Sequence, residues 1–438
     1  MSTKTKAQLQ YEEARLALET LERHGFQAML AGGCVRDRLM GRDPKDYDIA
    51  TNARPDAVSK VFTGEGRQVV PTGIEHGTVT LVMPQGPIEI TTLRKDVETD
   101  GRRAKVVFDG ATFEEDAARR DFSINAIYED LRGQIVDYFD GRKALKERRL
   151  AFVGDPRQRI QEDYLRILRF FRFWARLQFE PEAHAIEAIA EDCKGLRQVS
   201  QERITSELVQ MFREDVVLEP LRAMIQTGVL ATVFPDLMGK TLRPELTEEL
   251  RRVNPEHDFR SLARLASLFF EQKGVEADGA GQDEARWMQD LATKMRLSNA
   301  DIRSLTWLVG GWAGLEGVGD LDSDRMAFLD HCESSAGPLS WERFFRPTWS
   351  QFARHTRHRN AVQVMAQIQA LDVCETTKGW LRRTKLPLTG HDVMQVTGKA
   401  SGSELGQLMG RLLVAFRDGH WHSREEGLDW LKAHSVQP

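Results

Sequence analysis

The chain has 438 residues, which corresponds to about three domains of ordinary size and is long enough to bury several hydrophobic cores. Hydrophobic residues make up 41% and charged residues 29% of it, close to the averages of globular proteins. No uncharged run reaches the ~18 residues that a transmembrane helix needs, so a membrane-spanning protein is excluded. The 61 basic and 66 acidic residues give a net charge of -5, so any affinity for nucleic acid must come from local basic patches.

Residues 1–25 lack the apolar segment of a signal peptide and predict an amphipathic helix with Leu16, Leu18 and Leu21 inside it. The four cysteines contain no C-x-x-C pair, so neither a zinc site nor a disulfide framework is predicted, and we expect packed thiols. They are Cys34, Cys193, Cys332 and Cys374. Both observations favour a cytoplasmic protein without a membrane partner.

Hydrophobic patterning divides the chain into two unequal parts. Between residues 26 and 140, short apolar runs such as GTVTLVM and IEITTL alternate with turns rich in Gly, Pro and Asp, which predicts a small mixed sheet with helices. From Arg142 onward, stretches such as QERITSELVQMFRE have the period of helices. We therefore expect an elongated molecule with an α+β N-terminal head followed by all-α modules, and a surface loop over Gly274–Glu284.

Two features between Leu30 and Thr51 favour phosphate chemistry. Gly32 and Gly33 end a predicted strand just before a helix, so backbone N–H groups could approach an anion closely, although an ordinary tight turn explains two glycines at least as well. Asp46 and Asp48 lie two residues apart on a predicted strand and therefore point to the same face. A pair of Mg²⁺ ions would relieve their repulsion and support an in-line phosphoryl displacement, whereas a solvated loop is the alternative for D-x-D.

Other candidates come from two further stretches. Glu89, in PIEITTLR, is the one acid in a predicted buried strand and could add a third carboxylate, although an edge-strand Glu facing water is an equal alternative. In ARRDFSINA, Arg120 supplies a cation for phosphate or ribose. Asp121 and Asn125 could orient that cation through charge-assisted hydrogen bonds, although a capped helix would show the same pattern.

A predicted helix with the sequence QEDYLRILRFFRFWAR carries acids and arginines at spacings of three or four, which places them along one stripe. These residues are Glu162, Asp163, Arg166, Arg169, Arg172 and Arg176. Residues 142–176 contain eleven Lys or Arg against four Asp or Glu. The excess favours a nucleotide or nucleic-acid footprint, because a solvated face of ion pairs would need more acidic partners than this stretch contains.

Together these stretches resemble the class II tRNA nucleotidyltransferases and bacterial poly(A) polymerases, of the polymerase-β-like nucleotidyltransferase superfamily. The matching motifs are L-x-G-G-x-V-R-D-x-L-x-G-x-x-P-x-D-x-D, R-R-D-F-[TS]-I-N-A and E-D-x-x-R-x-L-R-x-x-R-F, in the family's order and spacing. The resemblance covers about Met29 to Glu214, including QERITSEL. It returns more faintly near the C-terminus, in PLTGHDVMQVTGKASGSELGQLMGRLL, which is similar to the tRNA-contacting end of these enzymes.

The resemblance implies roles for the matching residues. The acids at Asp46 and Asp48 would bind Mg²⁺, and Glu89 is kept beside them as a catalytic candidate. Side chains at Asp163 and Arg166 would select the base, because an Asp acceptor and an Arg donor suit cytosine and adenine but not uracil or guanine. The expected nucleotide-binding set is Gly32, Gly33, Arg36, Asp37, Arg120, Asp121, Asn125, Asp163, Arg166, Arg169 and Arg172.

The family offers full CCA addition, CC addition, A addition or poly(A) synthesis. Leu93–Phe108 resembles the flexible loop that CC-only members lack, and the chain ends without the basic extension that poly(A) polymerases tend to carry. We therefore expect CCA addition to tRNA from CTP and ATP, with A-only addition and poly(A) synthesis as alternatives. A catalytically silent RNA-binding protein would have no use for the acids and Arg166 together. The oligomeric state is not predicted.

The expected domains are a catalytic head over residues 1–140, a base-recognising neck over 141–215, a helical body over 216–350 and a tRNA-binding helical tail over 351–438. His257-Asp258 and His391-Asp392 look like fragments of an HD phosphohydrolase. That site needs further ligands at helical spacing, which the sequence does not provide, so a hydrolase domain is not favoured.

Overall fold

The computed structural model describes residues 4–99, 104–108, 110–235, 281–299, 301–302, 305–306, 387–397, 408–409, 411–412, 415–416 and 420–434. The chain divides into two compact units, residues 1–240 and 241–438, which are considered separately. The finer division into head, neck, body and tail stays a prediction. Within the described ranges, no helix combines the length and the apolar character needed to cross a membrane.

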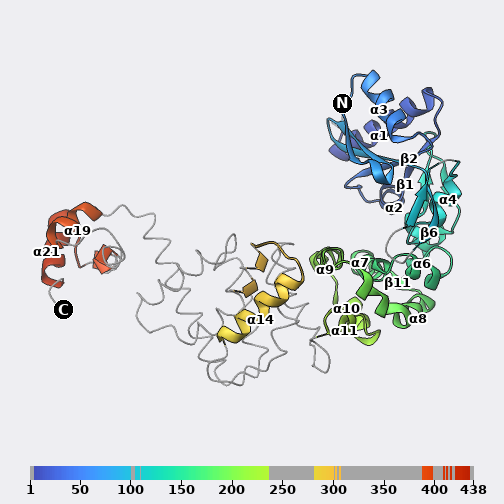
Figure 1. The fold of residues 1–438 in the computed structure, drawn as a ribbon. Coiled ribbons are helices and arrows are strands. Elements are labelled where there is room, and N and C mark those ends of the chain that lie inside the picture. Colours follow the sequence, from blue (N-terminus) through green and yellow to red (C-terminus); the bar gives the residue numbers. More distant parts are fainter. Residues whose placement is uncertain are drawn as a thin grey trace. The chain divides into compact units, whose positions relative to one another are not determined.

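The first unit is built on a seven-stranded mixed sheet with the order β3-β4-β5-β2-β1-β8-β9 (Figure 1). Only β2 and β5 are parallel neighbours; the other pairs are antiparallel. The strands are β1 (Ala28–Ala31), β2 (Tyr47–Thr51), β3 (Val69–Gly73), β4 (Thr78–Met83), β5 (Gly86–Thr92), β8 (Ile127–Glu129) and β9 (Ile135–Asp137). This sheet, with helices on both faces, confirms the α+β head.

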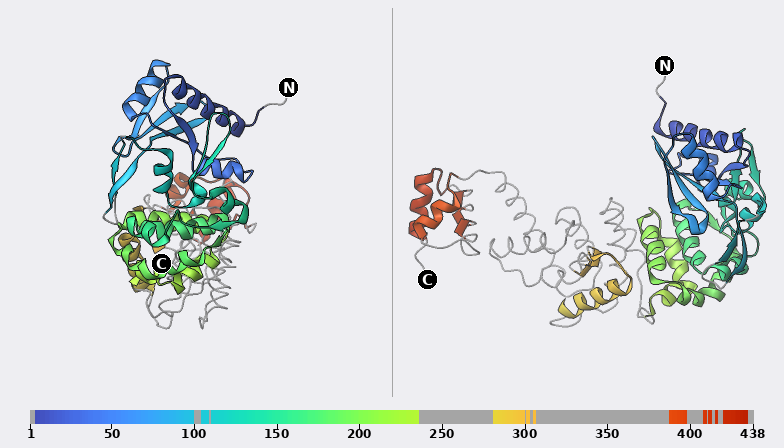
Figure 2. Two further views of the ribbon diagram at one scale, coloured as in Figure 1. Left: turned by 90° about the vertical axis from the view of Figure 1, so that its right-hand side faces the viewer. Right: turned by 45° about the horizontal axis from the view of Figure 1, so that its top comes forward.

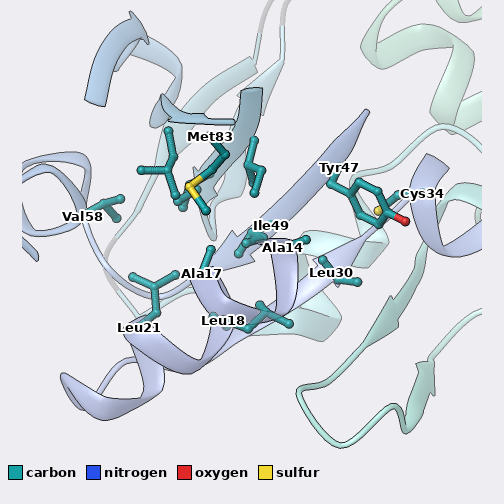
Figure 3. Close-up of a cluster of buried hydrophobic side chains, with 14 of the residues drawn as sticks. Ala14, Ala17, Leu18, Leu21, Leu30, Cys34, Tyr47, Ile49, Val58 and Met83 are labelled. Atoms are coloured by element: carbon teal, nitrogen blue, oxygen red, sulfur yellow. The ribbon is translucent and has the colours of Figure 1, made fainter. Parts of the chain in front are cut away.

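Helices α1 (Lys6–Arg23), α2 (Gly33–Leu39) and α3 (Pro55–Gly64) contribute to the core on one face of the sheet. Figure 3 shows Leu18 and Leu21 of α1 directed toward the strands. The predicted helix containing Leu16, Leu18 and Leu21 is confirmed as α1, in which Leu18 and Leu21 are buried whereas Leu16 is 40% exposed. Residues two positions apart in a helix are separated by about 200° around its axis. Leu16 therefore points away from the side that Leu18 occupies.

The opposite face of the sheet is covered by α4 (Phe113–Ala118), whose Phe113 packs with Tyr128 of β8. The predicted flexible loop over Leu93–Phe108 contains an antiparallel hairpin of β6 (Lys95–Thr99) and β7 (Ala104–Val107). The tip of that hairpin, residues 100–103, lies outside the described residues.

Helices dominate the rest of the first unit, as the sequence predicts, and Figures 1 and 2 show them gathered at one end of the sheet. They are α5 (Gly141–Glu147), α6 (Pro156–Glu162), α7 (Leu165–Leu177), α8 (Ala183–Asp192), α9 (Gln201–Arg213), α10 (Leu218–Gln226) and α11 (Val229–Val233). A short parallel pair of β10 (Arg149–Leu150) and β11 (Glu180–Pro181) interrupts them. Phe122, Phe170 and Phe173 form an aromatic contact between the head and α7.

The second unit is described in three helices, α14 (Gly281–Lys294), α19 (Gly390–Thr397) and α21 (Arg424–His434). Since α14 begins at Gly281, the expected surface loop over Gly274–Glu284 is wrong for its last four residues; residues 274–280 lie outside the described residues. Acidic Asp283 and Glu284 suit the first turn of a helix.

The C-terminal helices enclose Trp421, which is fully buried and donates from Nε1 to the carbonyl oxygen of Leu412 at 3.0 Å. Asp392 accepts from the backbone N–H of Thr389 at 2.8 Å and from the guanidinium of Arg424. His391-Asp392 is therefore part of a capped helix start, in which the acid is already used. His257-Asp258 lies outside the described residues.

Gly141, at the start of α5, packs closely against the short 3-10 helix Ser123–Asn125 and against Ile127 of β8. A Cβ there would lie 2.3 Å from the carbonyl oxygen of Ser123 and 2.6 Å from Cγ1 of Ile127. We expect Gly141→Ala to lower the free energy of unfolding by about 1–3 kcal/mol, as overpacking of a core does. Gly64→Ala is the control, because a Cβ at Gly64 meets nothing within 4 Å. Urea denaturation of both variants measures the difference, and equal stability of the two would contradict this packing.

Candidate active site

Strands β2 and β5 place acidic side chains on one face of the sheet. Asp48 lies directly opposite Glu89 in the parallel register, so both point to the same side. Tyr47 and Ile49, the neighbours of Asp48, point to the other side and are buried in the core. Asp46 is exposed in the turn that leads into β2. The structure thus brings together the three acids that the sequence singled out.

The side chains of these acids are not engaged by protein donors in the described part of the chain. Neither Asp46, Asp48 nor Glu89 has a side-chain hydrogen bond or ion pair there. Burial, and then the negative charge of Glu89, raise the pKa of Asp48 to about 6, whereas Arg120 lowers it. A carboxylate with this environment favours either a proton or a cation.

The donor set fits a hard divalent cation. Carboxylate oxygens are the ligands that Mg²⁺ prefers, and Mg²⁺ typically uses one or two of them together with water and substrate phosphate. Among the described residues, no three His, Cys, Asp or Glu side chains form a group that could hold a metal ion. Asp46 and Asp48 therefore fit as a two-residue site, and metal ligation by Glu89 stays a prediction.

Arg120 lies beside the two glycines. Its Nη1 donates to the carbonyl oxygen of Asn125 at 3.1 Å, and its Nη2 donates to Oδ2 of Asp116 at 3.1 Å. A Cβ at Gly32 would lie 2.6 Å from this Nη1, and Gly32 has a φ of +74°, so glycine is needed there for both space and conformation. The Arg120 side chain is 22% exposed and lies next to the Gly32-Gly33 turn and near Asp48.

Asp116 and Tyr128 hold Arg120 in place but were absent from the predicted set. The Tyr128 hydroxyl donates to Oδ2 of Asp116 at 2.7 Å, and Arg120 Nε donates to the Tyr128 oxygen at 3.1 Å. The spacing between Asp116 and the Arg119-Arg120 pair, three and four residues, is the one available signal in the sequence.

A second group forms a buried network between α2 and α7, consisting of Arg36, Asp37, Asn125, Asp121 and Arg169. Arg36 donates to Asp37 Oδ1 from Nε at 2.8 Å and to Asn125 Oδ1 from Nη1 at 2.6 Å. Asn125 Nδ2 donates to Asp121 Oδ1 at 3.1 Å, and Arg169 Nε donates to Asp121 Oδ2 at 2.8 Å. Five residues of the predicted nucleotide-binding set thus form one connected structure.

The buried network is electrostatically satisfied. Burial raises the pKa of Asp121, but the charge of Arg169 and the hydrogen bonds from Asn125 and Arg169 outweigh it and bring that pKa to about 2. Arg36 is only 2% exposed, and its guanidinium is occupied by protein acceptors. These contacts favour a positioning role for Arg36 and Asp37, and direct nucleotide contact by either stays a prediction.

Asp163 and Arg166 lie at the junction of α6 and α7, and each has its own partners. Asp163 Oδ2 accepts from Arg203 Nη2 at 2.7 Å. Arg166 donates to Glu162 Oε2 at 2.7 Å and to the carbonyl oxygen of Arg119 at 2.7 Å. The second contact ties Arg166 to the motif that carries Arg120.

Two arginines of the stripe, Arg169 and Arg172, contact Glu207, an acid that the sequence did not single out. Arg172 Nε lies 2.6 Å from Glu207 Oε2, and Arg169 Nη1 lies 3.7 Å from Glu207 Oε1. Arg176 pairs with Asp37 at 3.3 Å. The expectation that this stripe lacks acidic partners is therefore wrong. Its partners come from α2 and from α9, the QERITSEL helix, which a local count of charges does not include.

The pKa of Asp48 generates a stability test. The neutral form is favoured in the folded state, because the pKa rises from 3.8 to about 6. The stability gained by protonating Asp48 in the folded state is therefore fully present below about pH 3.8 and is lost as the pH rises through about 6. In EDTA, we expect the free energy of unfolding of the unmodified protein to fall relative to that of Asp48→Asn between about pH 4 and 6, measured by urea titration at each pH. A constant difference over this interval would contradict the assignment.

Comparison with known proteins agrees with this geometry. Residues 28–151 match the family described as "Poly A polymerase head domain", and residues 178–240 match "Probable RNA and SrmB- binding site of polymerase A". The "CCA tRNA nucleotidyltransferase 1, mitochondrial" of Danio rerio is 30% identical over 418 residues, covering 94% of this chain and 89% of the relative. The "CCA-adding enzyme" of Streptococcus suis is 38% identical over 301 residues, covering 68% of this chain and 70% of the relative.

Solved structures show the same fold. The CCA-adding enzyme of Bacillus stearothermophilus, in complex with CTP, has a TM-score of 0.62 and 26% identity, covering 99% of this chain and 98% of that chain. The Thermotoga maritima CCA-adding enzyme complexed with tRNA has a TM-score of 0.64 at 22% identity, covering 97% of this chain and 95% of that chain. Sequence motifs, site geometry and these relatives agree, and the chain belongs to the family of CCA-adding nucleotidyltransferases.

Proposed function

We propose that this chain adds C, C and A in succession to the 3′ end of tRNA, using CTP and ATP and the Mg²⁺ ions held by Asp46 and Asp48. The observation that carries this proposal is the acidic pair at the start of β2, Asp46 and Asp48, in a chain with a CCA tRNA nucleotidyltransferase relative that covers 94% of it. A structural role does not account for these acids, because they have no protein partner within the described residues.

The residues around the acidic pair suit nucleotidyl transfer. When bound, Mg²⁺ supplies charge stabilisation for the attacking and leaving oxygens of the reaction. Arg120 presents a partly exposed cation beside Gly32, where it can bind the triphosphate of the incoming nucleotide. Glu89 keeps a third negative charge next to Asp48, which strengthens the attraction of this face for cations.

Base choice is assigned to the junction of α6 and α7. Asp163 is held by Arg203, so its carboxylate is an acceptor in a fixed position. The exocyclic amino groups of cytosine and adenine can donate to it, whereas the corresponding groups of uracil and guanine are acceptors. Arg166 would have to exchange its contact with Glu162 for the base edge.

The test is extension of tRNA transcripts that lack all three terminal nucleotides, or only the final A. CTP and ATP are supplied singly and together, and products are resolved on sequencing gels. We expect two C additions with CTP alone and completion with both nucleotides. Extension of only the transcript that lacks the final A would establish A-only addition, and a long ladder with ATP would establish poly(A) synthesis. No extension of either transcript would contradict the proposed function.

Asp48→Ala should lower the rate of nucleotide transfer by about 10²–10³-fold or more, as removal of a group that supports transition-state charge stabilisation does. Binding of tRNA, measured by filter retention, should persist because the fold does not rest on a charge that lacks protein partners. Asp56→Ala is the matched control, since Asp56 is an exposed acid on α3. Near-normal turnover of Asp48→Ala in Mg²⁺ would show that Asp48 is not a metal ligand.

Asp163→Ala should relax the choice of base. The preference for CTP over UTP is measured as the ratio of their kcat/KM values. Loss of one hydrogen-bond partner for the base should lower this preference by about 1–3 kcal/mol. Arg203→Gln should shift the same ratio in the same direction but less, because it releases the carboxylate without removing it. An equal loss of rate with all four nucleotides would show that Asp163 supports the fold and does not select the base.

A further inference from the structure

A second concave site lies at the opposite end of α2 from Gly33. Its volume is about 400 Å³, and its walls come from the end of α2, from α5 and from the segment that follows α7. None of the residues assigned to the active site lines it. The volume falls within the range of ~300–1,000 Å³ that is usual for small-ligand pockets.

The walls of this basic pocket combine three cations, Arg142, Lys146 and Arg148, with apolar side chains that include Leu39 and Leu145. No acidic residue lines it. Such a composition suits a ligand that carries negative charge at one end and an apolar or aromatic surface at the other.

The three cations differ in what they already contact. Arg148 donates from Nη2 to the carbonyl oxygens of Leu177 and Gln178, both at 3.4 Å, and its guanidinium lies 5.1 Å from the centre of the Phe179 ring. It therefore closes the end of α7 and forms a wall of the pocket. Its backbone has a φ of +52°, which is uncommon for a residue other than glycine.

Arg142 and Lys146 have no ion pair within the part of the chain that the structure describes. Glu147, the acid on the same helix, lies 3.4 Å from Arg149 instead. Asp137 accepts a hydrogen bond from the backbone N–H of Arg142 at 2.8 Å and so caps the start of the helix. Within the described residues, its carboxylate forms no ion pair with the Arg142 guanidinium. Both cations are exposed at the pocket.

Helix electrostatics explain only part of this arrangement. Lys146 is in the last turn of α5, where a cation is favourable because carbonyl groups point outward there. Arg142 is in the first turn, where the same dipole disfavours a cation. A further anion would offset that cost, and it would also offset the mutual repulsion of Arg142 and Lys146.

We propose that the basic pocket binds one nucleotide unit of the tRNA substrate, with its phosphate on Arg142 and Lys146 and its ribose or base against Leu39 and Leu145. This proposal rests on the proposed function, because it takes tRNA as the source of the phosphate. Leu39 is 42% exposed, and a nucleotide in this position would cover it. The length of α2, ~10 Å, separates the pocket from Gly33, so one RNA molecule is large enough to contact both.

The experiment measures tRNA affinity by fluorescence anisotropy at several salt concentrations in Arg142→Gln, Lys146→Gln and the double variant. Lys143→Gln is the matched control, because Lys143 is an exposed cation on the same helix that does not line the pocket. We expect each pocket variant to weaken tRNA binding roughly two- to fivefold, since single exposed charge pairs are of this strength. The double variant should reduce the slope of log K against log salt by about 0.7–0.9, the value for one lost phosphate contact.

Two further readouts separate the sources of the phosphate. KM for tRNA should rise in the double variant, while kcat and the equilibrium-dialysis affinity for CTP stay unchanged. Loss of CTP or ATP binding with tRNA binding intact would make a free nucleotide the occupant and overturn the proposal. Equal loss in Lys143→Gln and Lys146→Gln would assign the effect to the general positive charge of α5, and this outcome, too, would overturn it.

If the double variant kept the tRNA affinity and the salt slope of the unmodified protein, the pocket would have no part in RNA binding. These binding measurements do not require catalysis. If the unmodified protein bound tRNA through the pocket but failed to extend it, the proposed function would fail while the pocket assignment stood.

Discussion

The geometry of the active site depends on one buried ionised carboxylate, that of Asp121. It lies between the head and α7 and accepts hydrogen bonds from Asn125, from Arg169 and from the backbone N–H of Phe122. Removal of one partner from a buried ion pair typically costs about 3–5 kcal/mol, because the other charge is left without compensation. Through Asn125 the same network reaches Arg36, on the helix that begins beside the acidic pair. This network therefore fixes α2, which carries Arg36, relative to α7, which carries Arg169.

The contrast between Asp121 and Asp48 separates structural from functional acids. Both are shielded from water, yet protein partners bring the pKa of Asp121 to about 2, whereas burial and Glu89 raise that of Asp48 to about 6. The fold supplies hydrogen-bond donors to the Asp121 carboxylate but none, within the described residues, to the Asp48 carboxylate, which favours a cation at Asp48. The charges of the chain alone, without its relatives, therefore distinguish the two acids.

Local patterns predicted the features that depend on local geometry. Alternation along β2 places Asp48 opposite the buried Tyr47 and Ile49, and the sequence is sufficient to say so. The partners of the arginine stripe were not predictable in this way. Glu207 and Asp37 lie 35 and 139 residues from the arginines they contact, and a count of charges within one helix cannot include them. The burial of Arg36 was missed for the same reason, because Asn125 and Phe173, which surround it, come from other elements.

Helix α9 contacts residues of the predicted nucleotide-binding set, although it carries none of them itself. Its Arg203 fixes the Asp163 carboxylate, and its Glu207 pairs with Arg172 on α7. A protein that replaces a nucleic-acid template must hold its hydrogen-bonding groups as rigidly as a paired base would, because a mobile acceptor can adapt to the wrong base. The two ion pairs hold α9 at two points, one on Asp163 in the link between α6 and α7 and one on Arg172 of α7. If Asp163 selects the base as proposed, a change at Arg203 would act on specificity through the position of the Asp163 carboxylate, without any contact with the nucleotide.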